Sequence, residues 1–142
     1  MVNICIDNSF LILLLTKEDS FNKAQLLWRE WQTKNNTIIA PKLIYYEASN
    51  VLHRLQRFKQ IDSAQEKLNL VFKLNIKIYE YDQLHQDALA IAERFQLPAA
   101  YDAHYLALAE KMKIDFYTCD KKLFNSVQQN FPRIKLVATN SS

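Results

Sequence analysis

Residues 97–120 read LPAAYDAHYLALAEKMKIDFYTCD, and this stretch decides the fold because a helical pattern passes directly into a strand-like one. In its first half, apolar residues recur every three or four positions from residue 101 to residue 112, which predicts a helix. Asp102 lies one turn before Leu106 on the apolar stripe, so its carboxylate is expected to face the core. An inward-facing carboxylate is a candidate for ligand binding.

The second half of the stretch predicts a strand that ends at another acid. Phe116, Tyr117, Thr118 and Cys119 are aromatic, β-branched or readily buried residues, and Asp120 follows them directly. In α/β folds, ligands bind just beyond the carboxyl ends of the strands. Asp120 is therefore a second candidate for a ligand site.

The rest of the chain repeats this alternation between strand-like and helical patterns. Further strands are predicted over residues 2–6, 37–40, 76–79 and 134–138. Further helices are predicted over residues 21–33, 42–58, 62–74, 82–95 and 121–129, with a short apolar turn at residues 10–15. Residues suited to cap helix starts are Asp19, Ser20, Asp62, Ser63 and Asp82. The order predicts a parallel sheet layered between helices, in a three-layer α/β/α arrangement.

The length of 142 residues fits one domain, which buries about 68% of the surface of its unfolded chain. We expect the domain over residues 1–138 and a flexible tail over residues 139–142. Glycine is absent from the sequence, which excludes the glycine-rich phosphate loops of P-loop and Rossmann proteins. The net charge of +3 permits a polyanionic partner without requiring one.

The two cysteines and one short apolar run bear on where the protein works. Cys5 and Cys119 lie in strand-like runs without metal-ligand spacing, so we expect buried reduced thiols rather than a disulfide or a zinc site. Reduced thiols are typical of a reducing compartment. The apolar run at residues 10–15 is far shorter than the ~20 residues that span a bilayer. These features predict a cytoplasmic protein without a membrane segment.

Two more acids occupy unusual positions. Asp7 directly follows the first predicted strand. Glu47 lies between Leu43 and Val51 at i, i+4 spacing, on the apolar stripe of its helix. Taken singly, each acid has an ordinary explanation: the aspartates can cap helices or favour helix N-termini. Taken together, four carboxylates at one sheet edge repel one another but form a good site for a hard cation.

The segments around these acids resemble the four acidic motifs of the PIN-domain ribonucleases, particularly the VapC toxins of bacterial toxin–antitoxin pairs. They are CIDNSFLI (5–12), IYYEASNVL (44–52), YDAHYLALAEK (101–111) and YTCDKKLF (117–124). The resemblance covers essentially the whole chain, in order. It implies a five-stranded parallel sheet in the order 3-2-1-4-5, and a Mg²⁺ or Mn²⁺ site formed by Asp7, Glu47, Asp102 and Asp120.

The resemblance also implies which residues support the site and where the chain departs from the family. Ser9 and Thr118 are expected to be supporting polar groups near the acids. Cys119 stands where the family often has a polar residue, and no glycine shapes the turn before the fourth strand.

We therefore expect a metal-dependent endoribonuclease that leaves 5′-phosphate and 3′-hydroxyl ends. Asp7, Asp102 and Asp120 are assigned to metal contact, and Glu47 to the positioning of metal or water. The alternative is a catalytically silent PIN-like module that binds RNA or another protein. A rival enzyme class, the haloacid-dehalogenase-like phosphatases, resembles the chain only at Asp7 and requires a second aspartate where this sequence has Ser9.

The histidines and basic residues give weaker signals. His104 lies two residues from Asp102, about 200° round the helix, so we expect it to face away from the acids. His53 and His85 are expected on the surface. Five basic residues could neutralise RNA phosphates, although a solvated charged face explains them equally well: Arg54, Arg57, Lys59, Lys121 and Lys122.

Residues 42–74 carry more apolar side chains than one buried helix face needs. Besides the core stripe they include Tyr45, Tyr46, Phe58, Leu70, Val71 and Phe72, which we expect in the core or at an interface rather than as base-stacking platforms. The surplus predicts a homodimer and a groove near the acids for an amphipathic antitoxin segment. By resemblance to VapC toxins, a basic antitoxin side chain would compete with the metal. The alternative is that these residues complete the monomer's own core.

Overall fold

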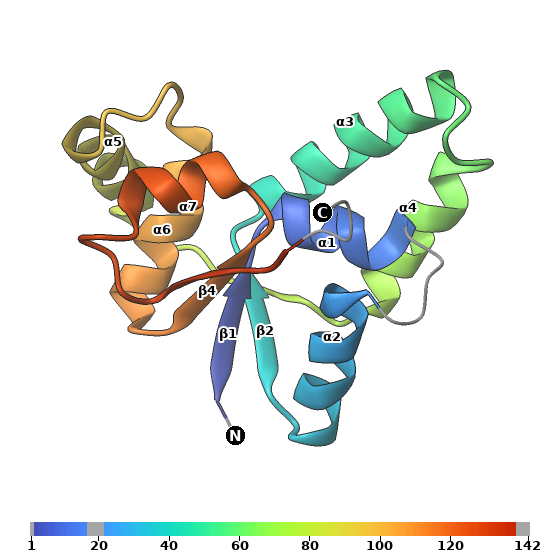
Figure 1. Cartoon of the computed structure of the whole chain (residues 1–142), viewed down its shortest axis with the longest axis horizontal. Coiled ribbons are helices and arrows are strands. Elements are labelled where there is room, and N and C mark those ends of the chain that lie inside the picture. Colours follow the sequence, from blue (N-terminus) through green and yellow to red (C-terminus); the bar gives the residue numbers. More distant parts are fainter. Residues whose placement is uncertain (1, 17–21, 139–142) are drawn as a thin grey trace.

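A five-stranded parallel sheet runs through the centre of the protein, in a computed structural model that describes residues 2–16 and 22–138 (Figure 1). The strands are β1 (Asn3–Ile6), β2 (Thr37–Ala40), β3 (Lys77–Ile78), β4 (Asp115–Thr118) and β5 (Ile134–Leu136). They lie in the order β3-β2-β1-β4-β5 and all neighbouring pairs are parallel. This confirms the expected order 3-2-1-4-5.

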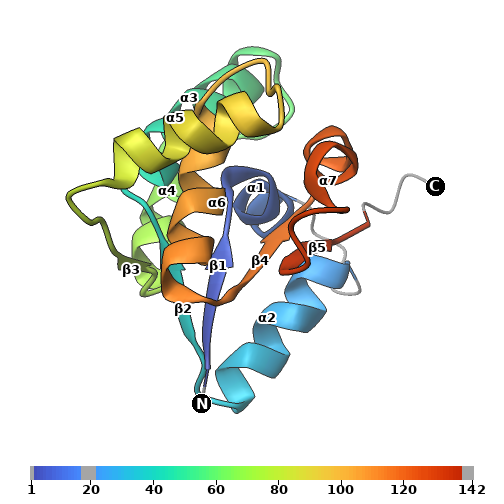
Figure 2. The same cartoon turned by 90° about the vertical axis from the view of Figure 1, so that its left-hand side faces the viewer.

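The described residues form seven helices, which cover both faces of the sheet. They are α1 (Asn8–Thr16), α2 (Lys23–Thr33), α3 (Leu43–Arg57), α4 (Ala64–Lys73), α5 (Leu84–Arg94), α6 (Tyr101–Met112) and α7 (Lys121–Val127). Figure 1 shows α1 to α4 on one side of the sheet and α5 to α7 on the other. In the perpendicular view, α5 lies outside α6 (Figure 2). The three-layer α/β/α architecture is confirmed.

The core is built on β1, whose residues Ile4, Cys5 and Ile6 are all buried. A central parallel strand is covered by helices on both faces, so it reads as a continuous apolar run instead of alternating with polar residues. Aromatic side chains extend the core on each side of the sheet. The ring of Tyr105 stacks on Phe116 at a centroid distance of 6.0 Å, and other rings pack around Trp31.

The turn from α6 into β4 forms without a glycine. Lys113 ends α6 in the left-handed conformation, with φ 57° and ψ 49°. Four other non-glycine residues adopt a similar φ just after helices: Asn35, Lys59, Asn75 and Gln96. A left-handed conformation costs a residue with a side chain about 1–2 kcal/mol. The fold accepts this cost at each turn, and the missing glycine does not displace β4.

Near the N-terminus, two predicted helix starts differ from the structure. Residues 10–15, predicted as a turn, belong to α1, because the Leu11 N–H donates to the Asp7 carbonyl oxygen (3.2 Å) and closes the first helical turn. Helix α2 begins at Lys23, because the side chain of Asn22 caps it by accepting from the Gln25 N–H (2.8 Å). The predicted caps at residues 19 and 20, and residue 21, lie outside the described residues.

Later in the chain, one predicted cap is confirmed and one is wrong. Ser63 caps α4 by accepting from the Glu66 N–H (3.1 Å). Asp82 does not cap α5, because the Leu84 N–H bonds to the Tyr81 carbonyl oxygen (3.0 Å) in a tight turn, and α5 begins without a side-chain cap.

Most of the predicted elements are shorter in the structure, among them two strands and the last helix. Only Lys77 and Ile78 of the predicted strand 76–79 pair with β2, β5 ends at Leu136, and α7 ends at Val127. The partner strands are themselves short, so pairing stops early. The predicted tail at residues 139–142 lies outside the described residues. Across residues 2–16 and 22–138, the search for a helix long and apolar enough to cross a membrane found none.

Candidate active site

Strands β1 and β4 are parallel neighbours, with Ile6 opposite Tyr117, and both end at the same edge of the sheet. Asp7 directly follows β1, and Thr118 is the last residue of β4. Asp120 follows two residues after the end of β4, where it N-caps α7. The sheet topology therefore brings two of the predicted acids to one edge.

Asp7 is the most buried of the four acids, with a relative exposure of 3%. Its carboxylate accepts hydrogen bonds from Ser9 Oγ (2.6 Å), the Phe10 N–H (3.1 Å) and Thr118 Oγ1 (2.5 Å). Burial raises the pKa of Asp7 to about 7, the three hydrogen bonds oppose this shift, and the charge of Asp102 adds to it. Asp7 is thus held in one orientation, in surroundings that disfavour its negative charge.

Ser9 and Thr118 tie the two strand ends together. Their hydroxyl oxygens lie 3.2 Å apart, Ser9 Oγ accepts from the Cys119 N–H (2.8 Å), and Thr118 Oγ1 accepts from the Asp120 N–H (3.0 Å). Both hydroxyls also donate to Asp7. These contacts are those of supporting polar groups, the role expected for the two residues.

Asp120 acts as a helix cap, the ordinary role considered above, and it also has an oxygen available for a ligand. Its Oδ1 accepts from the Leu123 N–H (3.0 Å), as a helix cap does. Among the described residues, no donor is recorded for its second oxygen. One oxygen therefore serves the fold and the other is available to a ligand.

Glu47 lies on α3 and is half-buried. Tyr105 of α6 donates from its hydroxyl to Glu47 Oε1 (2.5 Å). Burial raises the pKa of Glu47, while this hydrogen bond and the charge of His104 lower it. By sequence, Tyr105 is one of the apolar residues that recur through the predicted helix 101–112, and no site role was predicted for it. Its spacing of three residues from Asp102 is the signal that would have placed its hydroxyl near the acids.

Asp102 is half-buried in the first turn of α6. Burial raises its pKa to about 6, and the charges of Asp120 and Glu47 raise it further. Since Asp7 also feels the charge of Asp102, this residue is electrostatically linked to the other three acids.

All four acids line one pocket of about 480 Å³, together with Asn8, Ser9 and Tyr105. The predicted convergence of the acids is thus present in the structure. Within residues 2–16 and 22–138, however, no three acidic, histidine or cysteine side chains are grouped closely enough to hold a metal ion as they stand. The acids surround the pocket, and shared binding of one ion requires their side chains to move inward.

The donor set of this pocket fits a hard divalent cation. Carboxylate oxygens are ligands that Mg²⁺ and Mn²⁺ prefer. Among the described residues, no lysine or arginine forms an ion pair with any of the four acids. Asn8 Oδ1 is buried at the same pocket, with no hydrogen-bond partner in the described part of the chain. A cation would balance the negative charge and satisfy this oxygen.

Of the remaining predicted residues, Cys119 lines this pocket and the others discussed here lie outside it. His104 lines a neighbouring pocket, although its charge reaches Glu47. His53 and His85 are exposed, as predicted. Both cysteines are free, and burial raises the pKa of the half-buried Cys119 to about 12. The five basic residues named above are all exposed.

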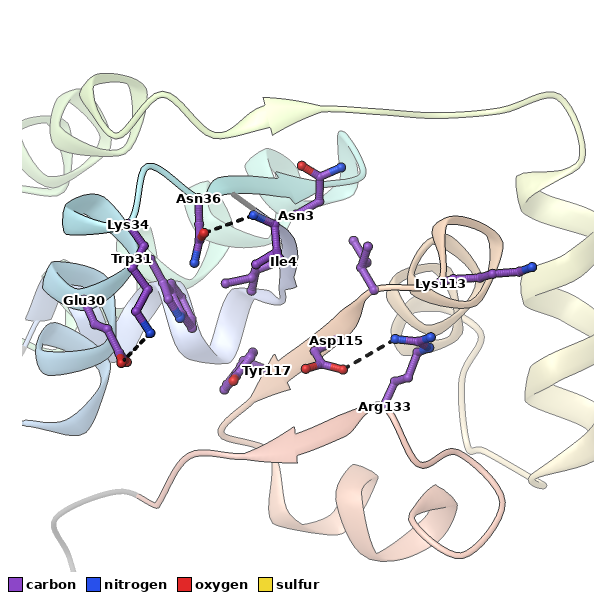
Figure 3. Close-up of a pocket in the computed structure, with 12 residues that line it drawn as sticks. Asn3, Ile4, Glu30, Trp31, Lys34, Asn36, Lys113, Asp115, Tyr117 and Arg133 are labelled. Atoms are coloured by element: carbon purple, nitrogen blue, oxygen red, sulfur yellow. Dashed lines mark hydrogen bonds and ion pairs between the residues drawn. The ribbon is translucent and has the colours of Figure 1, made fainter.

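A larger pocket of about 560 Å³ lies at the opposite end of the sheet, where the strands begin (Figure 3). Its two acids face bases: Glu30 pairs with Lys34 at 3.0 Å and Asp115 with Arg133 at 3.7 Å. Because these charges are already balanced, this pocket is a weaker candidate for a cation site.

Comparison with known proteins agrees with this architecture. Solved structures that are similar include a protein from Pyrobaculum aerophilum, at 23% identity and a TM-score of 0.65, covering 88% of this chain and 84% of that one. A toxin–antitoxin complex from Klebsiella pneumoniae matches at 19% identity and a TM-score of 0.62, covering 96% of this chain and 98% of that one. VapBC2 from Rickettsia felis, bound to a DNA fragment from its promoter, matches at 16% identity and a TM-score of 0.63. The match covers 96% of this chain and 97% of that one.

No curated protein matches the chain by sequence. The family model for the PIN domain matches residues 4–129, which is most of the chain and includes all four acids. The predicted family is therefore confirmed: the chain belongs to the PIN-domain family.

Proposed function

We propose that the protein is a metal-dependent endoribonuclease, the toxin of a VapBC-type toxin–antitoxin pair. The observation that carries this proposal is the pocket at the carboxyl edge of the sheet, which four carboxylates line without a basic partner among the described residues. PIN domains are generally nucleases, and the similarity to toxin–antitoxin structures supports the toxin assignment.

In this proposal Asp7, Asp102 and Asp120 hold Mg²⁺ or Mn²⁺. When bound, such an ion supplies Lewis-acid chemistry: it polarises a phosphoryl oxygen and makes a water molecule more acidic. Ser9 and Thr118 keep Asp7 in place through their hydrogen bonds. They act as positioning residues.

Glu47 is assigned to the attacking water. Tyr105 holds one carboxylate oxygen of Glu47, and burial raises the pKa of the acid, which makes it a better proton acceptor than an exposed glutamate. The water oxygen forms a bond to phosphorus as the bond from phosphorus to the 3′ oxygen breaks. The 3′ oxygen then takes up a proton, so the products carry 5′-phosphate and 3′-hydroxyl ends.

A cleavage assay across purified RNA classes tests this function. The protein is incubated with transfer, ribosomal and messenger RNA in Mg²⁺ or Mn²⁺, with and without EDTA. We expect endonucleolytic products that disappear in EDTA and return when excess metal is added. Cleavage that persists in EDTA would contradict the metal mechanism. Absence of cleavage with every RNA and metal would favour the silent binding module.

We also propose that the protein self-associates and binds an antitoxin segment. Besides Tyr46, three apolar side chains in or next to α3 and α4 are exposed, Phe58 (64%), Leu70 (44%) and Phe72 (55%), and we call these three the α3–α4 patch. Val71 instead lies in the core, and half-buried Tyr45 packs against Phe72 at a centroid distance of 5.1 Å. Exposed apolar patches mark interfaces.

Light scattering of the purified protein, and of the Phe58→Lys and Phe72→Lys variants, tests the patch. We expect a dimer that the charged variants convert to a monomer, and co-purification of a small protein encoded beside this one. A wild-type monomer at high concentration without such a partner would leave a solitary nuclease as the better description. The cytoplasmic location stays a prediction.

A further inference from the structure

We propose that a second pocket, beside the one lined by the four acids, binds a single unstacked nucleobase of the substrate and favours bases that carry an amino group. This inference rests on the proposed ribonuclease function. The pocket measures about 440 Å³ and its lining includes Tyr46, Tyr101, His85, His104, Lys42 and Glu80. Its volume lies within the ~300–1,000 Å³ typical of small-ligand sites. We call it the base pocket.

The base pocket and the acid pocket share two walls. Tyr46 precedes Glu47 on α3, and Tyr101 precedes Asp102 on α6. Successive residues on a helix point about 100° apart, so each helix gives one side chain to each pocket. A chain with a phosphate at the acids can therefore place a neighbouring base in the second pocket.

The two tyrosines have the properties of stacking platforms. Tyr46 is 65% exposed and Tyr101 is 63% exposed, and neither ring packs against another aromatic ring of the described residues. Exposed aromatic rings in a pocket beside a phosphate site suit unstacked bases, and each such contact is worth about 1–3 kcal/mol. This differs from the expectation that Tyr46 belongs to the core or an interface.

The hydrogen bonds of the two histidines decide which groups the pocket offers. His104 Nδ1 lies 2.8 Å from the Ala100 carbonyl oxygen, which can only accept, so Nδ1 carries the proton. In a neutral ring His104 Nε2 is then an acceptor, and it lies 2.9 Å from His85 Nδ1, which must donate. The free Nε2 of a neutral His85 is consequently an acceptor.

Glu80 adds a second acceptor to the same pocket. One of its carboxylate oxygens accepts from the Lys42 N–H (3.3 Å), and the other has no recorded donor among the described residues. The pocket thus offers two acceptors, the free Nε2 of His85 and the second Glu80 oxygen, beside the Lys42 side chain and the tyrosine hydroxyls. Adenine, cytosine and guanine present an amino group to such acceptors, whereas uracil presents a carbonyl oxygen in the corresponding position.

Binding to labelled oligocytidylate and oligouridylate of equal length tests the inference. Fluorescence anisotropy in Ca²⁺, a hard cation that carboxylates bind but that replaces Mg²⁺ poorly in phosphodiester cleavage, measures binding with little cleavage. We expect wild type to bind oligocytidylate more tightly, Tyr46→Ala and Tyr101→Ala each to lose roughly 10-fold in affinity, and Tyr46→Phe and Tyr101→Phe to retain most of it. Glu80→Gln and His85→Ala should reduce the preference for cytosine rather than overall binding.

Two matched controls and one comparison separate this inference from the proposed function. Leu89→Ala removes an apolar side chain of similar exposure (55%) elsewhere, and His53→Ala removes an exposed histidine; neither should change binding. Equal binding of the two oligonucleotides, with no loss in the tyrosine variants, would overturn the base pocket even if wild-type cleavage remains sensitive to EDTA. Tyrosine variants that change only self-association in light scattering would identify a protein interface instead, and would also overturn it.

Discussion

The two ends of the sheet carry pockets of similar size that differ in charge: the acids of one pocket are paired with bases, and those of the other are not. Where the strands begin, Glu30 and Asp115 each face a base within 4 Å, and all these side chains are roughly half exposed (Figure 3). Where the strands end, four acids share a pocket without a basic partner among the described residues. The larger of the two pockets is the balanced one, so unpaired charge rather than size distinguishes the candidate active site.

Burial strengthens this contrast. Asp7 is almost inaccessible, and burial raises its pKa to about 7. An acid in such surroundings is stabilised by a proton or by a cation. Substitutions in the acid pocket should therefore change activity, metal response and pH dependence, whereas substitutions in the ion-paired pocket should change these properties little.

The largest expected effect is on catalysis. Asp7→Asn or Asp120→Asn should lower RNA cleavage by at least ~10²-fold while the fold persists, because the amide keeps the shape but removes the charge that attracts metal. Asp115→Asn, at the other end, should leave cleavage within about twofold. Cleavage assays combined with circular dichroism measure both. Full, EDTA-insensitive cleavage by the Asp7→Asn variant would remove the basis of the mechanism.

The second effect is a pH dependence of stability in the metal-free protein. The pKa of Asp7 is about 7 in the folded state against 3.8 for an ordinary aspartate, so the folded protein binds an extra proton between these values. Stability is therefore highest below about pH 4 for this group, and falls as pH rises through about 7. The loss approaches roughly 4 kcal/mol, at about 1.4 kcal/mol per pH unit.

Urea unfolding in EDTA between pH 5 and pH 8 measures this slope. The Asp7→Asn variant should flatten it, because its amide does not titrate, whereas Asp115→Asn should keep it. Identical slopes in wild type and Asp7→Asn would show that Asp7 is not the titrating group.

The third effect is stabilisation by metal. At pH 8, Mg²⁺ or Mn²⁺ should raise the melting temperature by several degrees, since a ligand at 100 times its dissociation constant adds about 2.7 kcal/mol to stability. Asp102→Asn should lose most of this shift, because Asp102 is electrostatically linked to the other three acids. Glu30→Gln serves as the control and should respond like wild type. An equal response from Asp102→Asn would mean that the ion binds elsewhere.

The smallest effect is expected at the balanced end. Arg133→Ala removes an exposed ion pair with Asp115, and such pairs contribute about 0–1 kcal/mol. The loss should shrink further in 1 M NaCl, where exposed charges are screened. Thermal unfolding at low and high salt measures it. If Arg133→Ala lost as much stability as the roughly 4 kcal/mol pH effect expected for the buried Asp7, the distinction between the two ends would not hold.

The sequence predicted the parts of the site that follow from local spacing. Asp102 and Glu47 were found from helical periodicity, and Asp7 from its place after a strand; all line the pocket with Asp120. The strand order came from the family resemblance, and the structure agrees. These features depend on short patterns and on topology, which a single sequence carries.

The sequence did not predict contacts between distant segments. Tyr105 reaches Glu47 across 58 residues, and His85 reaches His104 across 19. The spacing of Tyr105 from Asp102 indicates only that its hydroxyl lies near the acids, and no local pattern pairs either residue with its partner. The wrong cap at Asp82 has a local cause instead, since a tight backbone turn from Tyr81 to Leu84 precedes α5. Whether the four acids act on RNA stays a prediction.

The residues that form the acid pocket lie far apart along the chain, and this separation determines when a newly made protein can assemble the pocket. Thr118 bonds to Asp7 across 111 residues, and β1 pairs directly with β4. A ribosome adds roughly 5–20 residues per second, so Asp7 exists for about 5–20 s before its partner is synthesised. The acid pocket is complete only after residue 120 has been synthesised. A nascent chain therefore has no assembled site beside the messenger RNA that encodes it.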